Sequence, residues 1–276
     1  MIRVERAAKR FASRVGGRSL LRAGAKTVVH AVRDVSFEAR DGAITGLLGP
    51  NGAGKTTTLR MLAALLAPDH GHLEVDGIDV IARPSAALAR MGLLSDARGL
   101  YPRLTARENI VYYGALQGMT RDAAHARAER LAEMLDMKPL LERRADGFSQ
   151  GERMKTALAR ALVHDPANIV LDEPTNGLDV IATRGLRETL RWLRGPEGGR
   201  KCIVFSTHIM QEVERLCDEV VVVAAGRTVA HGSVEALLEQ SGTKDFEEAF
   251  VRLAYAAGTT AGAEAIRGDD GSAGNG

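Results

Sequence analysis

Short apolar runs and longer segments with helical spacing alternate along the chain. Apolar side chains alternate at Val32, Val35 and Phe37, and a short, mostly apolar run follows at 44–48. Such runs are typical of strands. Further strand-like runs lie at 73–75, 91–94, 169–171, 202–205 and 220–223. Helices are predicted at 57–66, 85–90, 151–163, 181–193 and 210–217. This alternation predicts an α/β fold with a mainly parallel sheet covered on both faces.

The middle of the chain is more helical than the rest. Thr105 and Glu108 form a T-x-x-E capping box ahead of a helix at 110–116. Thr120 precedes a long amphipathic segment. Its apolar positions at helical spacing are Ala124, Ala128, Leu131 and Leu135.

The composition is that of a globular protein. Of 276 residues, 45% are apolar and 26% are charged, and the net charge of +2 is too small to indicate a nucleic-acid surface by itself. No run approaches eighteen apolar residues, and the start MIRVERAAKRF lacks the apolar stretch of a signal peptide. We therefore expect a soluble chain, whose membrane role would need a partner. Cys202 and Cys217 are expected to be buried thiols in a reducing compartment.

Two segments fall outside the pattern. Residues 13–26 carry basic side chains and no acid, which predicts an insertion or a long hairpin loop. A solvated loop is the simpler interpretation, and contact with anionic lipid or a partner is the alternative. The residues from about Gly258 onward lack any period and predict a mobile tail. The basic side chains are Arg14, Arg18, Arg22 and Lys26.

The strongest chemical motif is GPNGAGKTTTL at 49–59, between a predicted strand and a predicted helix. It matches G-x-x-x-x-G-K-[ST], the pattern of a phosphate-binding loop. Glycines let backbone amides wrap a polyphosphate, Lys55 supplies positive charge, and the Thr56 hydroxyl is a hard oxygen for Mg²⁺. A glycine-rich turn with a chance lysine is the alternative, and the order strand, loop, helix disfavours it. The candidate nucleotide-binding residues here are Gly49, Pro50, Asn51, Gly52, Ala53, Gly54, Lys55, Thr56 and Thr57.

A second motif, IVLDEP at 169–174, delivers two carboxylates at the end of a predicted strand. At the carboxyl edge of a sheet, Asp172 could approach Mg²⁺, and Glu173 could reach a water in line with the γ-phosphate. Adjacent acids are otherwise common on solvated edges, and the preceding phosphate loop favours a function.

The segment FSQGERMKTALARAL at 148–162 resembles the LSGGQ signature of the ATP-binding-cassette (ABC) ATPases, and it precedes LDEPTNGLD and STHIMQEVERLCD as it does there. The resemblance covers about 1–253. It implies a P-loop NTPase fold with a RecA-like, mainly parallel sheet, an N-terminal antiparallel β subdomain and an inserted α-helical subdomain at about 97–165. The ATPase domain would span 1–240, followed at 241–276 by a C-terminal helix and a disordered tail.

The resemblance also implies ATP and Mg²⁺ as cofactors and assigns roles to single residues. Phe11 would stack on adenine, although a core phenylalanine would look the same in the sequence. His208 would contact the γ-phosphate and position the water. Ser149 and Gly151 would bind the γ-phosphate of a second copy, while Ser149 within S-x-x-E could instead only cap its helix. Asp179 would lie at the seam between the two copies.

Two positions depart from the family pattern. Asp96 stands where the family usually has glutamine, and a carboxylate can accept a metal-bound water but cannot donate as an amide does. Asp96 is still expected to contact the nucleotide and the metal, and the change from an amide to a carboxylate bears on its role in coupling. Gln150 replaces the first of two signature glycines. Gly151 is therefore expected to be the residue whose backbone comes close to the phosphate.

The predicted function is ATP hydrolysis that powers a membrane transporter, and an exporter is favoured over an importer. The segment SDARGLYPRLTARENI and the single-domain layout are similar to the sodium-efflux (NatA-type) and drug-export branches of the family. The expected partners are an integral membrane permease and a second copy of the chain, at the cytoplasmic face of the membrane, with no nucleic acid. A soluble ABC ATPase acting on ribosomes or nucleic acid is the alternative. A GTPase or small-molecule kinase is a weaker one, because no N-K-x-D segment occurs.

Overall fold

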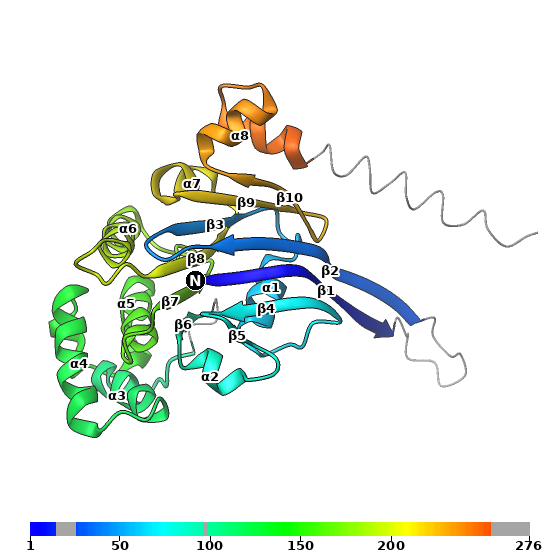
Figure 1. Ribbon diagram of the computed structural model, residues 1–276. Coiled ribbons are helices and arrows are strands. Elements are labelled where there is room, and N and C mark those ends of the chain that lie inside the picture. Colours follow the sequence, from blue (N-terminus) through cyan, green and yellow to red (C-terminus); the bar gives the residue numbers. More distant parts are fainter. Residues whose placement is uncertain (15–25, 96–98, 255–276) are drawn as a thin grey trace, which may run out of the picture.

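The computed structural model describes residues 1–14, 26–95 and 99–254. Its strands form one ten-stranded sheet in the order β5-β4-β1-β2-β10-β9-β3-β8-β7-β6 (Figure 1). The antiparallel half comprises β1 (Ile2–Arg14), β2 (Lys26–Ala39), β4 (His70–Val75) and β5 (Ile78–Asp79). The parallel half comprises β3 (Ile44–Leu48), β6 (Met91–Leu94), β7 (Asn168–Asp172), β8 (Cys202–Thr207) and β9 (Glu219–Ala224). The last strand, β10 (Arg227–Gly232), is antiparallel to β9 and meets β2.

Alternate residues of the parallel strands face opposite layers, as strand geometry requires. Ile169 and Leu171 of β7 pack in one apolar cluster, whereas Val170 packs in another on the opposite face. The first layer contains α3 (Ala106–Leu116), α4 (Arg121–Met134), α5 (Gln150–Leu162) and α6 (Val180–Arg194). The second face is covered by α1 (Lys55–Leu62), and α7 (Met210–Leu216) and α8 (Val234–Ser241) pack in a third cluster. The prediction of a sheet covered on both faces is confirmed.

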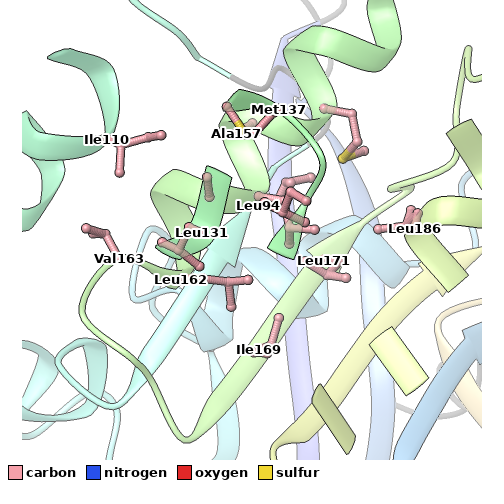
Figure 2. Packing of buried hydrophobic residues seen from close by; sticks show 14 of the residues in the cluster. Leu94, Ile110, Leu131, Met137, Ala157, Leu162, Val163, Ile169, Leu171 and Leu186 are labelled. Atoms are coloured by element: carbon pink, nitrogen blue, oxygen red, sulfur yellow. The ribbon is translucent and has the colours of Figure 1, made fainter. Parts of the chain in front are cut away.

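The helical subdomain is built around α5. Helices α3 and α4 lie on one side of α5, and the sheet lies on the other. Figure 2 shows Ala157 and Leu162 of α5 among side chains from α3, α4 and β7. The helix begins at a capping box, in which Ser149 and Glu152 satisfy each other's backbone amides. Thr105 and Glu108 make the same box at α3, as predicted. Short segments complete the layout: α2 (Pro84–Leu88) and the 3-10 turns at Lys138–Leu140 and Ala145–Gly147.

Helix α1 differs from the prediction at both ends: it begins at Lys55 and ends at Leu62, against an expected 57–66. The end is a Schellman motif without glycine. Ala64 adopts a left-handed φ of 53°, and the Leu65 amide donates to the Arg60 carbonyl at 3.0 Å. Alanine in this role gives no sequence signal, which explains why the prediction was too long.

Some predicted features lie outside the described residues, and some elements of the structure were not predicted. Strands β1 and β2 pair as far as Arg14 and Lys26, so the basic segment belongs to a hairpin whose residues 15–25 are not described. The tail from Gly258 is also outside the described range. Strands β5 and β10 and helix α8 were missed. Residues 246–254 are helical and lie within the segment 241–276, where a C-terminal helix was expected.

Both cysteines are free; Cys202 is buried, as expected, whereas Cys217 is partly buried beside apolar side chains. Burial raises the pKa of the Cys202 thiol to about 12, and it also raises the pKa of Cys217. Cys217 packs against β3 at Gly46, where an added Cβ would lie 2.6 Å from its Sγ atom. The central strand therefore has no room for a side chain at this position.

We predict that Gly46→Ala lowers the free energy of unfolding by about 1–3 kcal/mol, because the new methyl group collides with the Cys217 sulfur. Removing that sulfur leaves the next neighbours of the added Cβ at 3.7 and 3.8 Å, an ordinary contact. The double variant Gly46→Ala, Cys217→Ala should therefore be more stable than the sum of the single losses implies. Urea unfolding of the four proteins in this cycle measures the coupling, and strictly additive losses would contradict the proposed collision.

Candidate active site

The phosphate loop joins β3 to α1 and lies directly against other backbone. A Cβ at Gly49 would lie 2.2 Å from the Val223 carbonyl oxygen, and Gly54 has a φ of 106°. The Gly49 amide donates to the Thr207 carbonyl at 3.4 Å, and the Ala53 carbonyl accepts from the Gly226 amide at 3.0 Å. No side chain caps the N-terminus of α1, so its first amides face the loop. Such an N-terminus favours a bound anion.

Lys55 is folded back over its own loop. It is only 5% exposed, and its Nζ donates to the carbonyls of Gly49 at 2.7 Å and Pro50 at 3.1 Å. The Nζ also lies 3.7 Å from Oε1 of Glu173. Burial lowers the pKa of Lys55, and the nearby carboxylates oppose that shift. The lysine thus brings a partly desolvated positive charge to the middle of the loop.

Asp172 is the last residue of β7 and is buried at the carboxyl edge of the sheet. Its Oδ1 accepts hydrogen bonds from Ser206 Oγ at 2.6 Å and from Thr56 Oγ1 at 3.1 Å. Mg²⁺ binds hard oxygens at about 2.0–2.1 Å in an octahedron, whose edge is therefore about 2.9 Å. The 3.1 Å between the Thr56 and Asp172 oxygens fits two neighbouring positions of such an octahedron.

These two residues would not hold the ion alone. Among the described residues, no group of three His, Cys, Asp or Glu side chains could hold a metal. Mg²⁺ commonly keeps few protein ligands and takes the rest from phosphates and water. Asp96, the third expected metal contact, lies outside the described residues.

Glu173 lies between Lys55 and His208. Its Oε2 is 2.8 Å from His208 Nδ1, and its side chain is 15% exposed against 44% for His208. The backbone of Glu173 is left-handed, with a φ of 48°, which is strained for a residue with a side chain. Its amide donates to Ser206 Oγ at 3.0 Å, and its carbonyl accepts from the Asn176 amide at 3.1 Å. These bonds hold the carboxylate toward the loop.

Ser206 was not assigned a role from the sequence, although it joins both acids of the motif. It accepts from the Glu173 amide and donates to Asp172. The register of the sheet explains this, because Asp172 and Ser206 are direct partners on the parallel strands β7 and β8. A polar residue near the end of the neighbouring predicted strand was the only signal in the sequence.

Ser149, Gly151 and Asp179 form a second group. All three line a groove of about 900 Å³ between α5 and α6. Ser149 Oγ accepts from the Glu152 amide at 3.2 Å, and Asp179 caps α6 by accepting from the Ala182 amide at 2.8 Å. The hydrogen bond from the Ser149 amide holds the pKa of Glu152 below its usual range. The structure therefore shows Ser149 as a helix cap, and its hydrogen bonds stay within α5 rather than reaching the phosphate loop.

Phe11 lies on β1 opposite Val29 of β2, and the residue is 39% exposed. The Lys9 ammonium is 6.0 Å from the ring centroid. The ring is therefore not a core side chain, and one face of the hairpin offers it for contact with another planar group.

Comparison with known proteins places this geometry in a family. The family described as ABC transporter matches residues 32–176. The ABC transporter ATP-binding protein NatA of Bacillus subtilis (strain 168) is 44% identical over 227 residues, covering 82% of this chain and 91% of that protein. The Nod factor export ATP-binding protein I of Burkholderia lata is 43% identical over 220 residues, covering 79% of this chain and 70% of that protein.

Solved structures agree with the sequence relatives. The ATP binding subunit of an ABC transporter matches with a TM-score of 0.76 and 25% identity, covering 91% of this chain and 98% of that chain. A dimeric bacterial ABC transporter cassette matches with a TM-score of 0.72, 22% identity and coverages of 84% and 98%, which shows the fold alone. In the described residues, no helix combines the length and apolar character needed to cross a membrane. The chain belongs to the ABC transporter family, as one of its ATP-binding subunits.

Proposed function

We propose that this chain hydrolyses ATP at the phosphate loop with Glu173 as the general base, and that two copies enclose the nucleotide while powering export through a membrane permease. The observation that supports this most strongly is the meeting of Lys55, Glu173 and His208. Their contacts of 3.7 and 2.8 Å lie at the carboxyl edge formed by β3, β7 and β8. Ligands of α/β sheets bind at this edge.

The phosphate loop and α1 supply the binding energy for the triphosphate. Backbone amides of the loop and of the first turn of α1 donate to phosphate oxygens. Lys55 exchanges its carbonyl partners for the β- and γ-phosphates. Thr56 and Asp172 hold Mg²⁺, which when bound neutralises charge on the phosphates. The half-exposed Phe11 ring stacks on adenine.

Hydrolysis is assigned to Glu173 and His208. Glu173 accepts a proton from the attacking water, and His208 Nδ1 holds the carboxylate through its other oxygen. The imidazole is more exposed than the carboxylate, so its far edge is free to reach the γ-phosphate. Because the Glu173 side chain is only 15% exposed, few bulk water molecules compete with the attacking water for hydrogen bonds to its carboxylate.

A second copy completes the site. Ser149 and Gly151 stand at the N-terminus of α5, a position that favours an anion, yet they do not bond to the phosphate loop of their own chain. We assign them to the γ-phosphate held by the partner copy, with Asp179 at the seam. The dimeric cassette with this fold supports the arrangement.

Transport is assigned to a separate permease. One relative is a Nod factor export ATP-binding protein and another is an ABC transporter ATP-binding protein, and the first of these names supports export. We place the contact with the permease on the segment before and within α3, up to Leu116. Sodium or a drug-like molecule is the cargo class that we propose, carried by the permease rather than by this chain.

We predict that Glu173→Gln binds ATP and forms the ATP-dependent dimer but turns over about 10²- to 10⁴-fold more slowly, because the amide cannot accept the proton. Phosphate release gives the turnover, and size-exclusion chromatography with ATP gives the dimer. Glu214→Gln, on the exposed side of α7, is the matched control and should turn over normally. Wild-type turnover in Glu173→Gln would remove this residue from the catalytic role.

The shared site predicts complementation between two defective copies. Lys55→Ala lacks the loop lysine, whereas Ser149→Asp keeps a good helix cap but places a negative charge where the phosphate would bind. Each variant alone should be inactive. A mixture contains pairs with one intact site and should recover roughly a quarter of wild-type hydrolysis if the copies pair at random. No recovery of hydrolysis or of ATP-dependent pairing would show that each chain acts alone.

The permease assignment predicts co-purification with an integral membrane protein. Chain isolated from its own host in mild detergent should carry a partner with several membrane spans, and the pair should survive nuclease treatment. Recovery of RNA or DNA that is lost as salt is raised, with no membrane protein, would instead support a soluble ATPase acting on nucleic acid.

A further inference from the structure

Behind the proposed catalytic pair lies a buried carboxylate that the mechanism above does not use. Glu212 is on α7 and is only 6% exposed. Its Oε2 accepts two hydrogen bonds, from Thr175 Oγ1 at 2.8 Å and from Thr207 Oγ1 at 3.1 Å. None of the ion pairs among the described residues includes Glu212. Two hydroxyl groups are thus its side-chain partners.

Burying a carboxylate is unfavourable unless its oxygens are well satisfied. The other buried residues of α7, Val213 and Leu216, are apolar and pack in the core. An apolar side chain would fill the same space without the desolvation cost. The acceptor oxygen of Glu212 must therefore contribute something that packing alone does not.

The two hydroxyl groups belong to the two segments that carry the proposed catalytic residues. Thr175 lies two residues after Glu173, in the turn where the Glu173 carbonyl accepts from the Asn176 amide. Thr207 directly precedes His208, and its Oγ1 also accepts from the Ile209 amide at 3.0 Å. One oxygen of Glu212 therefore binds both the segment that follows Glu173 and the residue that precedes His208.

Thr207 extends this link to the phosphate loop. Its carbonyl accepts from the Gly49 amide, and in the sheet it is the partner of Leu48, the residue before the loop. Thr207 thus connects the phosphate loop to His208 and, through Glu212, to the segment after β7. A shift of either hydroxyl would change the 2.8 Å contact between Glu173 and His208.

We propose that Glu212 is a positioning residue for ATP hydrolysis: it ties Thr175 to Thr207 and so holds Glu173 and His208 in register with the nucleotide. This inference rests on the proposed function, in which Glu173 and His208 act on ATP. Glu212 itself touches neither nucleotide nor water in the reaction. Its loss should slow the chemical step and leave nucleotide binding nearly intact.

The first test compares three variants by steady-state ATP hydrolysis. Glu212→Ala should lower kcat on the order of tenfold and change KM for ATP by less than about threefold, since only the transition state needs the exact geometry. Glu212→Gln should recover kcat to within about threefold, because one amide oxygen can accept both hydroxyl hydrogens. Glu214→Ala, on the exposed side of the same helix, should match wild type.

A second variant covers the case in which Glu212→Ala fails to fold. Thr175→Val preserves shape and removes one donor, so it should show the same fall in kcat with little change in KM. Wild-type kcat in whichever of the two variants folds overturns the inference, as does a loss of kcat that Glu212→Gln does not recover.

A double-mutant cycle separates this inference from the proposed function. If Glu212 acts through Glu173, adding Glu212→Ala to Glu173→Gln should cause no further loss, whereas fully additive losses would overturn the positioning role. If Glu173→Gln itself turns over normally, the catalytic role proposed for Glu173 fails whatever Glu212 does. If Glu173→Gln is slow and Glu212→Ala is normal, only the present inference fails.

Discussion

The close approach of backbone to backbone around the phosphate loop is the constraint on which the site depends. A side chain at Gly49 would reach the β9 carbonyl of Val223, and a side chain at Gly54 would lie 2.6 Å from the Ala31 carbonyl on β2. The loop is therefore clamped between the parallel and antiparallel halves of the sheet. Lys55 leaves this loop at the start of α1, so its position is set by the same contacts.

The sheet carries this constraint to the acidic residues. Strand β8 pairs with β3 on one side and with β7 on the other, and its last residues satisfy polar groups of both neighbours. Ser206 binds Asp172 and the Glu173 amide, while the Thr207 carbonyl receives the Gly49 amide. A buried polar cluster of this kind is favourable only when every member is paired, because an orphaned group would cost about 1–3 kcal/mol. The pairing therefore fixes the geometry as well as the stability.

Local signals made much of the fold predictable. The phosphate loop, the capping boxes at Thr105 and Ser149 and the buried strands each depend on residues a few positions apart. Register across the sheet does not: Ser206 meets Glu173 across 33 positions and Glu212 meets Thr175 across 37, and no short motif encodes those distances. Strand β10 was missed because its residues show no regular alternation of buried and exposed side chains. It is a strand because it pairs with β9 and β2.

In the proposed mechanism, ATP binding and ATP hydrolysis are separable steps. Lys55 is paired with carbonyls of its own loop, so a triphosphate only has to exchange equivalent oxygen partners, and binding requires no rearrangement of the sheet. Hydrolysis in the proposed mechanism needs more, because the Ser149 group is held by its own helix and faces a groove with Asp179 rather than the phosphate loop. A copy with a filled loop is then competent to bind but incomplete for chemistry. In the proposed mechanism, the second copy supplies the missing anion contacts, so that assembly would be the step that permits hydrolysis.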